Sequence, residues 1–111
     1  MKKLSIFFLF LTLAFQLQGQ PESAEVKIKT SAICETCKKT IEHGMSFEKG
    51  VRSAKLDVET KVLSVVYNPS KTDENKLRVA LTKIGYDADS LKANPKAFHK
   101  LPECCQAPGH H

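Results

Sequence analysis

Residues 31–39 read SAICETCKK and place two cysteines, Cys34 and Cys37, three residues apart. Before this stretch, Val26 and Ile28 alternate with lysines, which is the pattern of a half-buried strand. After Cys37 the apolar residues recur at helical spacing. The stretch therefore predicts a strand, a loop that holds Cys34, and a helix that Cys37 opens.

The same criteria extend to the rest of the chain. Alternating apolar residues predict further strands, Gly50 and Gly85 follow predicted helices, and an apolar stripe precedes Gly85. The predicted order is β-α-β-β-α-β, an α+β, ferredoxin-like sandwich in which two helices cover one face of a four-stranded antiparallel sheet. We expect strands at residues 25–30, 51–58, 62–67 and 86–91, and helices at residues 37–47 and 73–84.

Residues 1–20 have the composition of a secretory signal peptide. Lys2 and Lys3 precede an apolar run at residues 4–15, and Gly19 lies near the expected cleavage point. The run is shorter than the roughly 20 residues that a membrane span needs. We therefore predict a periplasmic or otherwise exported protein with no stable membrane insertion after cleavage; an uncleaved anchor is the alternative.

The composition limits the classes of function. Loss of residues 1–20 would remove two of the 17 basic and none of the 12 acidic residues, which leaves a net charge of +3. No basic run is interleaved with aromatic residues, so we expect no nucleic-acid partner. The remaining chain suits one small core without a deep cleft, and it has no recognisable catalytic motif. We predict a monomeric protein that is not an enzyme.

The cysteine pair in the loop predicts binding of a soft metal ion. A thiol near a helix N-terminus is favoured as thiolate, and Lys38 adds positive charge beside it. Two thiolates satisfy a d10 ion that accepts low coordination, whereas Zn(II) prefers four ligands. Cys34 and Cys37 are therefore the primary candidate ligands, for Cu(I) first and Hg(II) next.

Other uses of the same pair remain open at this point. Four cysteines in an exported protein also fit disulfides, although neither close pair would remove much chain entropy. A small thiol-disulfide redox protein of thioredoxin-like type is the main alternative function, because C-x-x-C at a helix start also lowers a thiol pKa. A third alternative is an adaptor that binds protein through its sheet, with incidental cysteines.

Residues 92–111 form a C-terminal tail that is rich in potential metal ligands. We expect its side chains to form an auxiliary site or to complete the coordination at the loop, which would also admit Zn(II) or Cd(II). The alternatives are a flexible tail with incidental thiols, and terminal histidines that are an artificial addition. The candidate ligands of the tail are Cys104, Cys105, His110 and His111.

Taken together, four landmarks resemble the heavy-metal-associated domain family, which includes copper chaperones, metal-pump N-terminal domains and the periplasmic mercury-binding protein. The resemblance covers residues 25–90, and we assign residues 21–91 to this domain. The landmarks are Cys34-x-x-Cys37 after the first strand, Gly50-Val51 opening the second, Tyr67-Asn68-Pro69 closing the third, and Gly85-Tyr86 after the second helix.

The resemblance implies that Cys34 and Cys37 are the metal ligands. It also implies that Tyr86 lies near the metal loop, with simple core packing as the alternative. A metallochaperone of this kind would pass its ion to a membrane metal transporter or to another metal-binding protein. The chain departs from the family pattern where Ser31-Ala32-Ile33 stands in place of Gly-Met-Thr.

Overall fold

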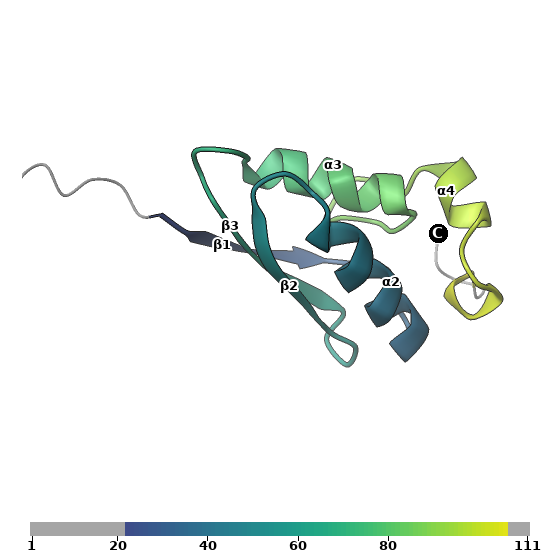
Figure 1. The fold of residues 1–111 in the computed structure, drawn as a ribbon. Helices are drawn as coiled ribbons and strands as arrows, with labels where there is room; N and C mark the ends of the chain where they lie inside the picture. Colours follow the sequence, from purple (N-terminus) through teal and green to yellow (C-terminus); the bar gives the residue numbers. More distant parts are fainter. Residues whose placement is uncertain (1–21, 107–111) are drawn as a thin grey trace, which may run out of the picture.

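The computed structural model describes residues 22–106, which form a three-stranded sheet, helices and a C-terminal segment that folds back (Figure 1). In order, the elements are β1 (Ala24–Lys29), α2 (Glu35–Ser46), β2 (Val51–Asp57), β3 (Val62–Tyr67), α3 (Glu74–Ile84), α4 (Pro95–His99) and the 3-10 helix η1 (Glu103–Cys105).

The sheet has β3 at its centre, in the order β1-β3-β2, with both neighbours antiparallel to it. Ala24 is opposite Tyr67 at one end of the β1–β3 pair, and Lys29 is opposite Val62 at the other. The β2–β3 hairpin has an irregularity between Val51 and Ser53. The predicted hairpin and the three predicted strands are therefore present, with bounds that differ by a residue.

The core lies between one face of the sheet and the helices α2 and α3 (Figure 1). Most residues that the sequence pattern assigned to the inner face are buried, whereas Ala54, Val58 and Ile84 are only partly buried. The buried residues among them are Val26 and Ile28 in β1, Leu56 in β2, Leu63, Val65 and Tyr67 in β3, Ile41 and Met45 in α2, and Leu77, Ala80 and Leu81 in α3.

The predicted fourth strand at residues 86–91 is absent from the described residues, where Ala88 forms only isolated bridges to Thr30 and to Leu91. The chain turns at Asp89, which has a positive φ of 52°. Its backbone N–H donates to the Lys29 carbonyl at 2.8 Å, and its carboxylate accepts from the Lys29 N–H at 2.9 Å. The side chain thus replaces the backbone carbonyl that a continuing ladder would supply, and pairing ends after one bridge.

Both long helices begin within two residues of their predicted starts. α2 begins at Glu35, two residues earlier than predicted, because Cys34 is its N-cap. α3 is capped by Asp73, whose carboxylate accepts from the Lys76 N–H at 2.8 Å. Aspartate is among the strongest N-cap residues, which accounts for the start of α3 at Glu74, one residue later than predicted.

Residues 92–106, called the C-terminal segment below, pack against the domain. The Asn94 N–H donates to the Thr82 carbonyl at 3.0 Å and so ties the segment to α3. Phe98 and Leu101 are buried in the common core, and η1 contacts α2. Figure 1 shows the segment turning back beside the N-terminal end of α2. These residues are packed structure, in contrast to the flexible-tail alternative.

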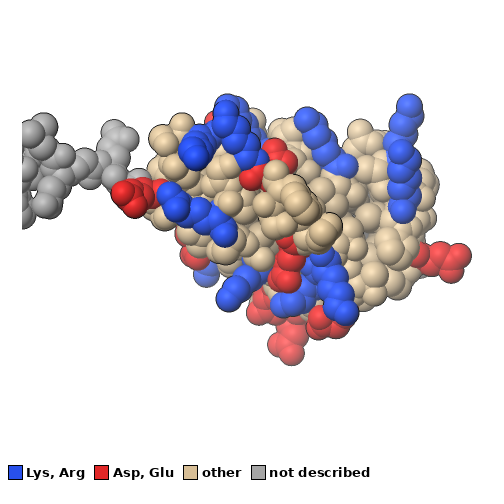
Figure 2. Space-filling model, in the orientation of Figure 1, with Lys and Arg blue, Asp and Glu red and all other residues tan. Residues whose placement is uncertain are grey.

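The surface carries both signs of charge. Figure 2 shows lysine and arginine side chains interspersed with acidic ones on the face in view. Between residues 22 and 106, no helix has the length and apolar character needed to cross a membrane. The predicted signal peptide lies outside the described residues.

Replacement of Asp89 tests the turn that ends the sheet. The Asp89 carboxylate also accepts from Arg78 Nε at 2.8 Å, so Asp89→Ala removes contacts to two partners. We expect a loss of about 1 to 2 kcal/mol in the free energy of unfolding, since hydrogen bonds to charged groups are of this order. Urea unfolding measures it, with Glu59→Ala in the exposed hairpin turn as the control. Equal stability of the two variants would contradict this account of the turn.

Candidate metal centre

The loop between β1 and α2 positions Cys34 at the N-terminus of the helix. Cys34 has extended backbone geometry, and its Sγ accepts a hydrogen bond from the Cys37 N–H at 3.4 Å. The sulfur therefore occupies the place of an N-cap oxygen, where helix N–H groups favour negative charge. The sequence predicted a thiol at a helix start, and the structure gives this position to Cys34 rather than to Cys37.

Four thiols converge at this point, and we call them the cysteine cluster: Cys34, Cys37, Cys104 and Cys105. Cys34 Sγ lies 3.1 Å from Cys37 Sγ, 3.4 Å from Cys104 Sγ and 3.8 Å from Cys105 Sγ. The sulfurs of Cys34, Cys104 and Cys105 all lie within 4.8 Å of one another, a spacing that could hold a metal ion. All four cysteines are free thiols in the structure.

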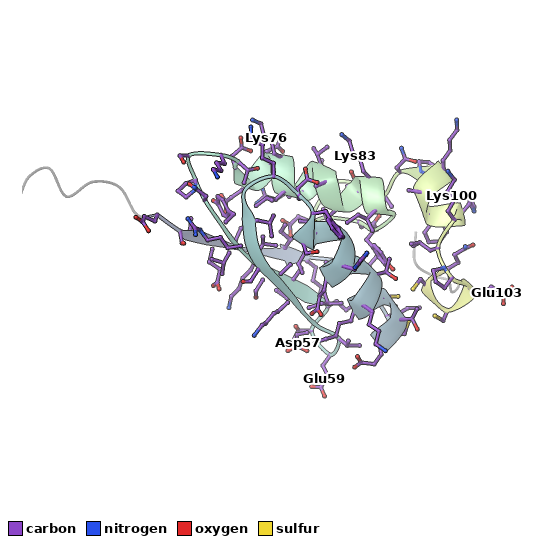
Figure 3. The ribbon with its side chains drawn as sticks, in the orientation of Figure 1. Asp57, Glu59, Lys76, Lys83, Lys100 and Glu103 are labelled. Carbon is purple, nitrogen blue, oxygen red and sulfur yellow. The ribbon has the colours of Figure 1, made fainter. Side chains whose placement is uncertain are left out.

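The cluster is buried on one side and open on the other. Cys37 and Cys105 are fully buried in the core, Cys34 is half-buried and Cys104 is exposed. Figure 3 shows sulfur atoms where the segment that carries Glu103 approaches α2. An ion bound here would contact the buried thiols of Cys37 and Cys105 on one side and would be accessible to solvent on the side of Cys104.

The environment of Cys34 favours its thiolate. Burial alone would raise its pKa, but hydrogen bonds with the Cys37 thiol and backbone N–H, and with the thiols of Cys104 and Cys105, outweigh burial and lower the pKa from 9.0 to about 7. Burial, followed by the neighbouring Cys37 thiol, raises the pKa of Cys105. The lowered pKa of Cys34 prepares this thiol to react or to bind at neutral pH.

Tyr86 lies beneath the cluster. Its ring is fully buried, and burial raises the pKa of its hydroxyl, with the adjacent thiols of Cys105 and Cys37 adding to the effect. The hydroxyl oxygen nevertheless has no partner with hydrogen-bonding geometry. The sequence offered two interpretations of Tyr86, core packing and a place near the metal loop. Both apply, because the side chain is part of the core and also adjoins the thiols.

Lys38 and Ala32, which the sequence places at the loop, are both engaged with the rest of the domain. Lys38 Nζ donates to the Leu56 carbonyl at 2.9 Å and pairs with Glu42 at 3.5 Å, so its ammonium is engaged with β2. Ala32, where the family pattern has methionine, is fully buried beneath the loop. His110 and His111 lie outside the described residues.

Sequence reasoning missed the hydroxyl groups that fix the loop. Thr30 Oγ1 accepts from the Ala32 N–H at 3.1 Å and donates to the Lys61 carbonyl at 2.8 Å. Ser31 Oγ accepts from the Asp87 N–H at 2.9 Å. Serine and threonine side chains often form hydrogen bonds with nearby backbone in loops, so the bond between Thr30 and Ala32 could have been predicted from the sequence. The partner of Ser31 is 56 residues away, so no local pattern predicts that bond.

A small α+β domain with two thiols at a strand-to-helix loop is suited to binding soft metal ions. The chain belongs to the heavy-metal-associated domain family, which matches residues 27–87, more than half of its length. This match contains Cys34, Cys37 and Tyr86, and it ends before the C-terminal segment.

Individual relatives and solved structures agree with this assignment. A copper-exporting P-type ATPase of Staphylococcus aureus (strain JH9) is 37% identical over 75 residues, which cover 68% of this chain and 9% of the ATPase. The CopZ metallochaperone has a TM-score of 0.56 at 27% identity and covers 59% of this chain and 98% of its own. Oxidized MerP from Ralstonia metallidurans CH34 has a TM-score of 0.57 at 25% identity and covers 60% of this chain and 94% of its own.

The pKa of Cys34 predicts its reactivity. Alkylation of Cys34 by iodoacetamide in the reduced, metal-free protein should rise with a midpoint near pH 7, because its folded pKa is about 7. The depressed pKa also stabilises the folded state fully above pH 9.0, and this contribution is lost as the pH falls through 7. Peptide mass spectrometry of pulse-labelled samples measures the rate, with the urea-unfolded protein as control. A folded midpoint near 9 would contradict the arrangement of donors around Cys34.

Proposed function

We propose that the protein is an exported metallochaperone that binds Cu(I), or next Hg(II), and transfers it to a membrane transporter or another metal-binding protein. The observation that carries the proposal is the approach of Cys34 Sγ and Cys37 Sγ to 3.1 Å at the N-terminus of α2, inside the matched domain. Soft sulfur ligands favour soft d10 ions. The proposed action is binding and transfer, and the protein is not an enzyme.

The exposure of the two thiols supports a direction for transfer. Cys37 is fully buried and Cys34 is half-buried, so a partner thiolate would reach the ion from the side of Cys34. The incoming thiolate forms a new metal–sulfur bond, and a bond to a cysteine of this chain then breaks. The ion keeps its oxidation state, and each released thiolate takes up a proton according to its pKa. The exchange therefore needs no oxidant, reductant or catalytic group.

The relatives support a transporter as the receiving partner. One relative is named a copper-exporting P-type ATPase and one neighbour a metallochaperone, and both share the domain that holds Cys34 and Cys37. The chain spans about a tenth of that ATPase, so the partnership is part of the proposal. The thiol-disulfide alternative is not favoured, because the family match accounts for the C-x-x-C loop within a metal-binding domain.

Export through residues 1–20 is also part of the proposal, supported by the basic start and the short apolar run. Mass spectrometry of the protein from the exported fraction should find a mature chain that begins near Pro21. An intact N-terminus at Met1 in that fraction would contradict cleavage.

Substitution of the loop thiols tests metal binding. Cys34→Ser together with Cys37→Ser should weaken Cu(I) binding by about 100-fold or more, since serine oxygen is a poor ligand for soft ions. Competition with a coloured Cu(I) chelator measures the affinity under reducing conditions. His43→Ala, on the exposed side of α2, is the matched control and should bind as the unchanged protein does.

The opposite pattern would overturn the proposal. Unchanged Cu(I) affinity in the double serine variant would remove these thiols from the function. Rapid turnover of disulfide substrates by the unchanged protein, lost in the same variant, would favour the redox alternative.

A further inference from the structure

We propose that Cys104 and Cys105 bind the same ion as Cys34 and Cys37, so that the C-terminal segment completes a four-sulfur site. Such a site would hold a divalent d10 ion such as Cd(II) or Zn(II) in addition to the ions expected for a two-cysteine loop. This inference rests on the proposed function and deepens it, because it assigns ligands outside the matched domain, which ends at residue 87.

The sulfur spacings fit higher coordination better than a two-sulfur site. In a tetrahedral site with metal–sulfur bonds of about 2.3 Å, neighbouring sulfurs lie about 3.8 Å apart, and in a linear two-sulfur site about 4.6 Å apart. Cys34 Sγ lies 3.8 Å from Cys105 Sγ and 3.4 Å from Cys104 Sγ. Cys34 Sγ and Cys37 Sγ are 3.1 Å apart, which is also nearer the tetrahedral spacing. The sulfurs of Cys34, Cys104 and Cys105 already lie within 4.8 Å of one another, and Cys37 Sγ lies 3.1 Å from Cys34 Sγ, so a fourth sulfur–metal bond requires movement of the Cys37 side chain toward these three.

The fold holds the two tail cysteines in this place. Phe98 and Leu101 anchor the C-terminal segment in the core. The Cys105 N–H donates to the Pro102 carbonyl at 2.8 Å and forms the tight turn of η1. Gln106 Nε2 then donates to the carbonyls of His99 and Leu101, which closes the segment on itself. Cys104 and Cys105 are thus presented to Cys34 by packed structure.

The Tyr86 hydroxyl is a second, independent observation that points to a ligand. The residue is fully buried beside Cys37 and Cys105, and its hydroxyl has no partner with hydrogen-bonding geometry. Buried polar groups are nearly always paired. A metal-bound thiolate at Cys37 or Cys105 would be a strong acceptor for this hydroxyl, whereas two neutral thiols are poor ones. A metal ion bound to these thiolates would therefore give the Tyr86 hydroxyl an acceptor.

The charge of the site sets the class of ion. Four thiolates around a divalent ion carry a net charge of −2, and around Cu(I) a net charge of −3. The nearby Lys38 ammonium bonds the Leu56 carbonyl and Glu42, so it does not offset this charge. Because buried charge is costly, the complete four-thiolate set favours divalent ions, and Cu(I) is expected to use fewer of the sulfurs.

Cd(II) titration of the reduced protein tests the proposal. Sulfur-to-cadmium charge-transfer absorption increases with the number of bound thiolates, so the unchanged protein should give the intensity of four. Cys104→Ser and Cys105→Ser should each lower that intensity by roughly a quarter and weaken Cd(II) binding about tenfold or more. Glu103→Gln in the same 3-10 helix retains every sulfur and is the matched control.

Each outcome decides the matter. Cys104 is exposed, so Cys104→Ser tests the ligand without disturbing the core, and circular dichroism checks the fold of the Cys105→Ser variant. The four-sulfur site would be overturned if the Cys104→Ser and Cys105→Ser variants kept the charge-transfer intensity and the Cd(II) affinity of the unchanged protein. If the unchanged protein still bound Cu(I) through Cys34 and Cys37, the proposed function would stand without it; failure to bind either Cu(I) or Cd(II) would overturn both.

Discussion

The hydrogen bond from the Cys37 N–H to Cys34 Sγ is the contact on which the site depends. It makes a thiol the N-cap of α2 and places both loop sulfurs at the positive end of the helix. The rest of the domain holds that helix end in place. The buried faces of Ile41 and Met45 fix α2 against the sheet, and the bond between Ser31 and Asp87 fixes the loop from the other side.

The C-terminal segment uses the same core to reach the site from the opposite end of the sequence. Gly85, which ends α3 with a positive φ of 122°, lies so close to α4 that a Cβ there would come within 3.1 Å of the Ala97 backbone. This close approach lets Phe98 pack into the core. The C-terminal segment thus adds two thiols to the two of the loop, and residues 92–106 are part of the folded domain.

Local pattern predicted most of the fold because most of it is specified locally. Alternation identified the three strands, the apolar stripes identified α2 and α3, and Gly85 identified the end of α3. The prediction of a fourth strand was wrong because a tertiary contact ends the pairing there. The Asp89 carboxylate accepts the Lys29 N–H in place of the backbone carbonyl of a continuing strand. In the site, the spacing of Cys34 and Cys37 alone predicted that their thiols lie together in the loop. The proximity of Cys104 and Cys105 was a hypothesis from composition, since nothing in the local sequence specifies how a tail packs 70 residues from its partner.

The most direct test of the account is X-ray absorption at the copper edge on the reduced protein loaded with one Cu(I). The account predicts a first shell made only of sulfur, with Cys34 and Cys37 among the ligands and a loss of scatterers when both are replaced by serine. A shell dominated by nitrogen or oxygen, or a spectrum that the double serine variant leaves unchanged, would contradict it.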